Sequence, residues 1–301
     1  MSVSLFKIKK WAKMLIGKSS YHVNQTEGLC YSRDKVEGYY NNLTEKITRF
    51  GAPDDEVPIT KHDQGPEVYF SIAIFQYGLA AYDLWLMRKD ESMLRKFHNC
   101  VDWAMKNQQE DGSWITFATH NPEQPYSAMA QGEGASLLVR AFILSGNSSY
   151  LDAAKRAIDF LLLPKERGGV AEYTHNGLFL YEFTYLPCVL NGWIFASWGL
   201  LDYAKISGDK NITDVWNLTV KTIAASLDTF DCGYWSYYNR AGAMTSPFYH
   251  NLHIAQLNVM YDLTGIEKFK IVSNRWTKYK CSRYNRLRAF IKKAVQKVLE
   301  R

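Results

Sequence analysis

Clusters of tyrosine beside charged and amide side chains are the residues of this chain whose types and spacing could do chemistry. The chain has 20 tyrosines. Three clusters adjoin the ends of predicted helices: residues 181–185, which include Glu182; residues 234–240, which end at Arg240; and residues 248–253. Aromatic rings next to charged groups suit sugars, which have apolar ring faces and hydroxyl edges. A single tyrosine at a helix end more often just packs there, but three such clusters with a Glu and an Arg favour a carbohydrate site.

Motifs for other chemistries are missing from the sequence. It contains no glycine-rich nucleotide motif, no HExxH and no GxSxG. His250 and His253 are three residues apart, a spacing that can bind metal on a helix, but a lone pair of histidines more often packs or forms hydrogen bonds. We therefore expect no metal and no organic cofactor.

A short QxxxGxW motif occurs at Gln108, Gly112 and Trp114. This motif is a repeat of terpene cyclases, where it ties a helix end to a neighbouring turn and is structural. A cyclase also needs a DxDD-type acidic cluster, which the sequence lacks. We therefore expect the motif to stabilise a turn and not to act in catalysis.

Helical stretches that alternate with short Gly-containing breaks must position these side chains. Apolar residues three or four apart predict four helix pairs: residues 68–89 with 92–107, 134–144 with 150–163, 190–206 with 214–230, and 253–263 with 267–280. The first helices share similar short sequences near their starts, at Gln76, Gln131, Asn191 and Gln256. A helix pair of this length cannot bury its apolar face alone, so neighbouring pairs must pack together. We predict an all-α (α/α) toroid of about four helical hairpins, with an open solenoid as the alternative.

The predicted organisation has three parts. Residues 1–61 form a basic segment followed by an irregular or β-hairpin region, residues 62–280 form the toroid, and residues 281–301 form a basic amphipathic helix. In this last helix the apolar positions follow helical spacing: Leu287, Phe290, Ile291, Ala294, Val295, Val298 and Leu299. Two interpretations stay open, a final helix packed on the body or a helix that docks on a membrane surface or a partner.

Positive charge gathers at the two ends of the chain. The net charge is +6, yet residues 1–18 hold five lysines and no acid, and residues 275–301 hold ten basic residues and one acid. The rest of the chain is acidic overall. A protein that binds long nucleic acid usually carries its positive charge on the folded face, so basic ends point to an anionic membrane surface or an acidic partner.

The cysteines and the hydropathy bear on location. The five cysteines are odd in number and widely spaced, without a CxxC, which favours reduced thiols over disulfides. No convincing signal peptide and no transmembrane run is present. We expect a cytoplasmic protein, and peripheral binding at the inner face of a membrane stays open.

Four sequence blocks resemble the C-terminal catalytic domain of the D-glucuronyl C5-epimerases. The blocks are QGPEVYF with IFQYGL at residues 64–79, AQG with VRA at 130–141, YE with VLNG at 181–192, and YHNLHIAQL at 249–257. The last block is the most specific, and the resemblance covers about residues 62–280. It implies an enzyme, without cofactor, that converts D-glucuronate to L-iduronate residues in polymers of the heparosan and heparan type.

The resemblance also implies roles for individual residues. Glu182, Tyr238 and Tyr249 fall on catalytic positions of the family. Residues expected to bind substrate are Arg240, His250, Tyr181, Tyr185, Gln76, Asn191 and Gln256. The family has tyrosine where this chain has Phe183, so Tyr181 or Tyr185 is expected to substitute.

Inversion at C5 of a uronate needs a proton removed next to a carboxylate and a proton returned on the opposite face. Glu182 and Tyr249 are assigned as the two opposed groups, with Tyr238 assisting and with Arg240 and His250 neutralising the intermediate. Either Glu182 or Tyr249 could remove the proton. Two other functions stay open, a uronate polysaccharide lyase and a non-catalytic glycan-binding protein of a polysaccharide assembly system. The expected partners are a glucuronate-containing anionic polysaccharide and, through the basic ends, a membrane or a polysaccharide synthase; a homodimer is left open, and nucleic acid is not expected.

Overall fold

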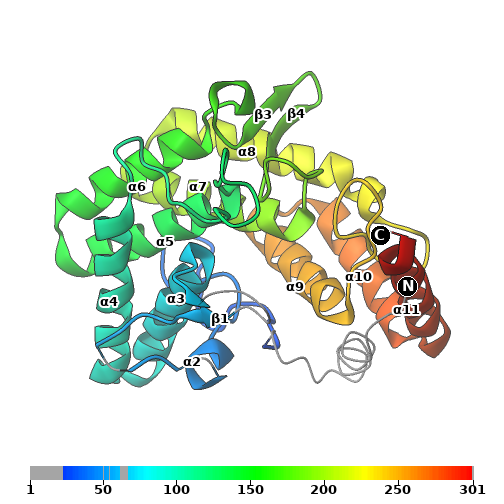
Figure 1. Ribbon diagram of the computed structural model, residues 1–301, viewed down its shortest axis with the longest axis horizontal. Helices are drawn as coiled ribbons and strands as arrows, with labels where there is room; N and C mark the ends of the chain where they lie inside the picture. Colours follow the sequence, from blue (N-terminus) through cyan, green and yellow to red (C-terminus); the bar gives the residue numbers. More distant parts are fainter. Residues whose placement is uncertain (1–22, 50, 54, 62–66, 300–301) are drawn as a thin grey trace. The chain divides into compact units, whose positions relative to one another are not determined.

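Helical hairpins dominate the computed structural model, which describes residues 23–49, 51–53, 55–61 and 67–299. Two compact units are found: residues 28–223, and residues 224–299 together with residues 23–27. We call them the large unit and the small unit. The large unit contains the hairpins α3–α4, α5–α6 and α7–α8 (Figure 1). Their bounds are Ser71–Arg88 and Glu91–Asn107, Ala128–Ser145 and Ser148–Leu161, and Leu190–Ser207 and Lys210–Ser226, with α8 running across the unit boundary.

The turns inside the three hairpins of the large unit follow one local scheme. The first helix ends at a residue with left-handed backbone, which is Gly146 after α5 (φ 70°) and Gly208 after α7 (φ 67°). Glycine is favoured at this position because it has no Cβ to clash. The next residue caps the second helix: Asn147 Oδ1 accepts from the N–H of Ser149 at 3.1 Å. A residue that ends one helix, followed at once by a residue that caps the next, explains why the chain turns at these positions.

The first helix of each hairpin is buried almost all round, as expected for a helix that is apolar or small-chained on every side. In α5 and α7 the burial extends over most of the helix. The two helices approach closely at Gly132 and Gly199, where a Cβ added to Gly199 would lie 2.4 Å from the Cα of Gly132. The second helices α4 and α6 are buried on one face only.

The QxxxGxW motif holds the end of α4 against the next hairpin, as predicted. Gln108 Nε2 donates to the carbonyls of Gly112 (3.2 Å) and Ala153 (2.9 Å). Trp114 is fully buried, and its Nε1 donates to the carbonyl of Ala104 at 2.9 Å. The motif is structural in this chain.

The remaining elements of the large unit are short. They are α2 (Glu45–Arg49), the antiparallel pair β1 (Thr60–Lys61) and β2 (Glu67–Val68), the 3-10 helix η1 (Lys165–Arg167), and the antiparallel hairpin β3 (Ala171–Thr174) and β4 (Gly177–Leu180). In the described residues before 68, the antiparallel pair β1–β2 lies within irregular structure, and the short helix α2 was not predicted. Residues 1–22, which include the basic N-terminal segment, and residues 62–66 lie outside the described residues.

The small unit holds the fourth hairpin, α9 (Pro247–Thr264) with α10 (Glu267–Cys281), and the final helix α11 (Arg283–Leu299). The short helix η2 (Leu227–Phe230) and a loop at residues 231–246 precede α9. Ala289 of α11 packs into an apolar cluster with Tyr234, Trp235 and Met244 of that loop.

All eight helices of the four predicted pairs are found in the described chain. Most starts were predicted too late: α5 begins at Ala128 and not at residue 134, and α9 at Pro247 and not at residue 253. The early turns were missed because Ser127 and Ser246 cap these helices ahead of the apolar pattern. Within the described residues no helix is both long enough and apolar enough to span a membrane.

Candidate active site

Glu182 is a buried carboxyl in the loop between β4 and α7 of the large unit. Its side chain is 7% exposed, and its Oε2 has no hydrogen-bond partner among the described residues. The side chain lies against Gly192 in the first turn of α7. Burial raises the pKa of Glu182 from 4.5 to about 8. A carboxyl with such a pKa can exchange a proton at physiological pH.

A second buried carboxyl, Glu133 of α5, was missed in the sequence. Gln76 Nε2 donates to its Oε1 at 2.7 Å, and its Oε2 has no hydrogen-bond partner among the described residues. Burial raises the pKa of Glu133 well above its usual range; the Gln76 hydrogen bond and the charge of Lys46 oppose this, and the charge of Glu182 adds to it. Gln76, predicted to bind substrate, is thus bound to Glu133. The signal in the sequence was an acidic residue inside an otherwise apolar and small-chained helix start.

The aromatic residues around Glu182 differ in their surroundings. The hydroxyl of Tyr181 donates to Glu172, and Lys165 Nζ lies 3.9 Å from the centre of its ring. Tyr185 is 45% exposed, and burial and the charge of Glu182 raise its pKa. Phe183 stacks on Phe117, with ring centres 4.4 Å apart. Of the two candidates to substitute for the family tyrosine, Tyr181 is thus bonded to Glu172, and Tyr185 has a pKa that the charge of Glu182 helps to raise.

Tyr238 and Tyr249 meet in the small unit. Their ring centres are 4.9 Å apart with an interplanar angle of 63°. Together they line a cavity of about 180 Å³. The other lining residues are Ala243, Met244, Thr245, Ser246, Lys293 and Gln296. Tyr238 is half-buried in the loop, and Tyr249 lies in the first turn of α9, where its N–H donates to the side chain of Ser246 at 3.4 Å.

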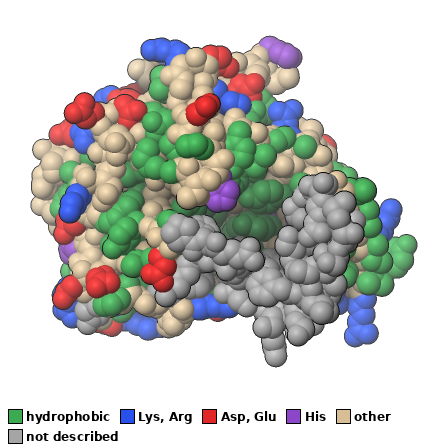
Figure 2. Space-filling model, viewed as in Figure 1, with side chains coloured by type: hydrophobic (Ala, Val, Ile, Leu, Met, Phe, Trp, Pro, Cys, Tyr) green, Lys and Arg blue, Asp and Glu red, His purple; other side chains and the backbone are tan. Residues whose placement is uncertain are grey.

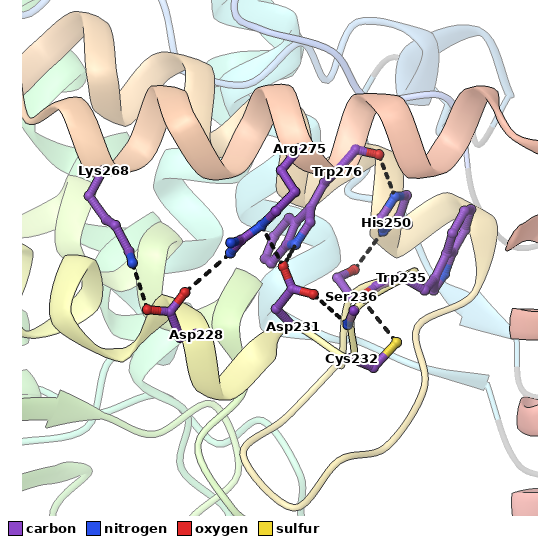
Figure 3. Close-up of polar contacts among 10 residues, drawn as sticks. Asp228, Asp231, Cys232, Trp235, Ser236, His250, Lys268, Arg275 and Trp276 are labelled. Atoms are coloured by element: carbon purple, nitrogen blue, oxygen red, sulfur yellow. Dashed lines mark hydrogen bonds and ion pairs between the residues drawn. The ribbon is translucent and has the colours of Figure 1, made fainter.

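The loop that carries Tyr238 is anchored by polar contacts to α9 and α10 (Figure 3). Arg275 of α10 forms ion pairs with Asp228 (3.2 Å) and Asp231 (2.8 Å). Trp276 Nε1 also donates to Asp231 at 2.9 Å, and Lys268 pairs with Asp228 at 2.6 Å. These contacts hold the start of the loop on one face of α10.

His250 is a packing residue of this anchor (Figure 3). It is fully buried and stacks on Trp235 with ring centres 3.7 Å apart. Nε2 is 3.1 Å from the carbonyl of Trp276, so it donates there, and Nδ1 accepts from the hydroxyl of Ser236 at 2.7 Å. Burial lowers the pKa of His250 to about 3, so the ring is neutral. Both nitrogens are engaged inside the unit; a role in binding substrate stays a prediction that would require these bonds to break.

The other predicted binding residues fall in different places. Arg240 is exposed and does not line the cavity. Asn191, at the start of α7, and Gln256, in the middle of α9, are both buried. Glu182, Asn191 and Gln76 belong to the large unit, whereas the tyrosine pair, Arg240 and Gln256 belong to the small one. That all of them face one cleft stays a prediction.

Among the described residues no group of three or more His, Cys, Asp and Glu side chains could hold a metal ion. His253, the second histidine of the predicted pair, is fully buried, and burial lowers its pKa to about 3.

The chain is similar to several curated proteins. It is 26% identical to a D-glucuronyl C5-epimerase of Caenorhabditis elegans over 226 residues, which cover 64% of this chain and 36% of that protein. It is 28% identical to an uncharacterised protein of Methanocaldococcus jannaschii over 155 residues, half of each chain. The chain thus matches half or less of the length of these relatives.

Comparison with solved structures shows the fold class. The cellobiose 2-epimerase of Spirochaeta thermophila aligns with a TM-score of 0.50 at 11% identity, over 82% of this chain and 63% of that one. This similarity, with the helical hairpins described above, confirms the predicted (α/α) toroid class. The family described as D-glucuronyl C5-epimerase C-terminus matches residues 108–278, more than half of the sequence. The chain therefore belongs to the D-glucuronyl C5-epimerase C-terminal family.

Proposed function

We propose that the chain is a polysaccharide uronate C5-epimerase that converts D-glucuronate residues to L-iduronate. Membership of the family supports this proposal, and so does the name of the C. elegans relative. The observation that carries it is the burial of Glu182, which raises the pKa of this carboxyl to about 8; the sequence resemblance assigns the same residue as the family's catalytic glutamate. At neutral pH most molecules hold the proton on such a carboxyl and can give it to C5, and the fraction that has lost it is a stronger base than a carboxylate with the usual pKa near 4.5.

In the proposed reaction the proton on C5 passes to one protein group, and the electron pair of the C–H bond spreads into the uronate carboxylate. A second group returns a proton to C5 on the opposite face, which inverts the centre without a net change in atoms or electrons. Glu182 and Tyr249 are the two groups we propose, with Tyr238, whose ring lies beside that of Tyr249, assisting. This chemistry requires neither a metal nor an organic cofactor.

One experiment separates this function from its alternatives. The protein is incubated with a glucuronate polymer in deuterated water and the polymer is followed by NMR. An epimerase incorporates deuterium at C5 and forms iduronate; a lyase would instead expel the C4 oxygen and produce a conjugated alkene that absorbs ultraviolet light. A glycan-binding protein would do neither, and that result would overturn the proposal.

We also propose that helix α11 docks the protein on an anionic membrane surface, at the cytoplasmic face where such a polymer would be made. Four apolar side chains one turn apart are 51–77% exposed, and we call them the α11 stripe: Leu287, Ile291, Val295 and Leu299. Exposed basic residues flank it, namely Arg283, Arg286, Arg288 and Lys292. Figure 2 shows hydrophobic side chains next to Lys and Arg at the edge where α11 lies. An apolar stripe with a basic border is typical of helices that lie in a membrane interface.

A further inference from the structure

The cavity beside Tyr238 and Tyr249 has a wall that comes from outside the family's matched region. Lys293 and Gln296 of α11 line it, whereas the family match ends at residue 278. The cavity holds about 180 Å³, less than the roughly 300–1,000 Å³ of pockets that enclose drug-sized ligands. A space of this size suits one sugar ring or one acidic group better than a longer segment of polymer.

Lys293 is fixed at this wall by its own contacts and by those of its helix. Its Nζ donates to the carbonyl of Met244 at 2.5 Å. One turn on, Gln296 accepts from the N–H of Met244 at 2.8 Å and donates to the carbonyl of Gly242 at 2.8 Å. These bonds join α11 to the strand-like backbone next to Tyr238, whose N–H donates to the carbonyl of Ala243. These bonds fix α11 beside the loop that carries Tyr238, and Lys293 lines the same cavity as the two tyrosines.

The charge of the cavity wall is positive. Among the described residues that line the cavity, Lys293 is charged and none is Asp or Glu. The ammonium group of lysine is a compact positive charge whose N–H donors suit a carboxylate. Tyrosine hydroxyls add further donors, and their rings offer apolar faces to a sugar. The site combines what a uronate presents, a carboxylate on an apolar-faced ring.

We propose that Lys293 binds the carboxylate of a uronate residue in the cavity formed with Tyr238 and Tyr249. This inference rests on the proposed function, which supplies the substrate class. It gives Lys293 the role of the cation at the uronate, a role that the sequence had suggested for Arg240. Arg240 is exposed and outside the cavity wall, whereas Lys293 is part-buried within it. A charge-assisted hydrogen bond to a partly desolvated ammonium discriminates a carboxylate from the neutral alcohol of the same shape.

The test compares two ligands on one protein. Dissociation constants are measured by titration calorimetry for a glucuronate-containing heparosan oligosaccharide and for the same oligosaccharide with its carboxyls reduced to alcohols. The wild type should prefer the acid, and Lys293→Gln should lower this preference about 10- to 100-fold, the size expected for one hydrogen bond to a charged group. Lys293→Arg should keep most of it. Arg286→Gln is the matched control, because it removes an exposed cation from the same helix away from the cavity.

The ratio of the two constants does not depend on how much of the protein is folded, so it separates binding from a loss of structure. Where Lys293→Gln does not fold, the wild type labelled with ¹⁵N-lysine replaces it: the side-chain signal that is absent in Lys293→Arg should shift with the acid and not with the alcohol. An unchanged ratio in Lys293→Gln, or an equal loss in Arg286→Gln, would overturn the inference. Preference for the acid that depends on Lys293 without deuterium incorporation at C5 would instead overturn the epimerase proposal and leave this inference standing.

Discussion

Gly192 lies so close to Glu182 that an added Cβ would come within 2.4 Å of Oε2 and 2.6 Å of the Cβ of Glu182. Only a glycine at the start of α7 leaves room for the buried carboxyl. We expect Gly192→Ala to push Glu182 out of its position, because the second contact is with the rigid base of the side chain. Deuterium incorporation at C5 should fall about 100-fold or more, since a displacement of about 1 Å can cost that much. NMR of the polymer in deuterated water measures it.

Gly199→Ala is the matched control for this variant. It adds the same methyl group to the same helix, but against the backbone of Gly132 and not against Glu182. Overpacking of this kind costs about 1–3 kcal/mol, so both variants should be less stable in urea unfolding. Equal loss of activity in the two variants would show that the contact with Glu182 has no particular importance.

The pKa of Glu182 makes the stability of the protein depend on pH. The folded protein keeps this carboxyl protonated up to about pH 8, whereas in the unfolded chain it loses its proton near its ordinary pKa of 4.5. The folded state thus binds more protons in this window, and the free energy of unfolding falls as pH rises from about 4.5 to about 8. Glu182→Gln stays neutral, so its stability relative to wild type should rise across the window by several kcal/mol, at about 1.4 kcal/mol per pKa unit.

Urea unfolding at pH 5 and pH 8 checks this expectation, with Glu110→Gln as a control in an exposed turn. The control should follow the wild type at both values. Glu182→Gln should also abolish deuterium incorporation while keeping the helical circular dichroism spectrum. A variant that incorporates deuterium at the wild-type rate would remove Glu182 from the mechanism.

Arg140 of α5 forms a fully buried ion pair with Asp202 of α7 at 2.6 Å. Its guanidinium also donates to the carbonyls of Glu37 and Gly38, each at 3.0 Å, and the hydroxyl of Tyr40 donates to Asp202 at 2.7 Å. Arg140 belongs to one of the blocks that resemble the family. In the structure it joins the loop at residues 37–40 to helices α5 and α7.

We expect Arg140→Met to lower the free energy of unfolding by about 3–5 kcal/mol, because it leaves the Asp202 carboxylate buried without its cation. Lys155→Met breaks the exposed pair with Asp159, whose side chains are each 56% exposed, and should cost no more than about 0.5 kcal/mol. Urea denaturation of both variants decides the matter. Similar losses in the two would mean that Asp202 is relieved by another group or by protonation.

Local pattern explains which parts of the fold could be predicted from the sequence. The helix pairs followed from apolar spacing and from turn residues such as Gly208, which act within a few positions of themselves. The role of Arg140 could not be predicted, because its partners outside α5 lie 62 to 103 residues away in the chain. The starts of α5 and α9 were misplaced because a single serine cap precedes each apolar run.

The candidate site divides in the same way. Glu182 and the two tyrosines were found through a family resemblance, which fixes residue types at short spacing. The burial of these side chains could not be predicted from the sequence. Burial raises the pKa of Glu182 and lowers the pKa of His250, which packs as a neutral ring. Glu133 was overlooked because its hydrogen-bond partner, Gln76, lies on another helix, 57 residues away in the chain. Lys293 was counted as one of many basic residues, since only the packing of α11 on the Tyr238 loop brings it to the cavity.

Helix α11 supplies the last prediction, binding to anionic membranes. The apolar positions expected to pack or to dock separate in the structure, because Ala289 and Gln296 set the face that contacts the loop while the α11 stripe stays exposed. We expect the full chain to float with vesicles of phosphatidylcholine containing 30% phosphatidylserine at physiological salt, and to float less with phosphatidylcholine alone, since each basic residue near an anionic surface contributes about 1 kcal/mol.

Replacing both Ile291 and Val295 by Ser keeps the charge but removes apolar area, and binding should fall about 10-fold or more, given roughly 1.5–3 kcal/mol for each such side chain when fully buried. Ile271→Ser is the matched control, because Ile271 is 57% exposed on α10 outside the stripe. A wild type that stays unbound, or a double variant that floats as well as the control, would show that the stripe does not bind lipid.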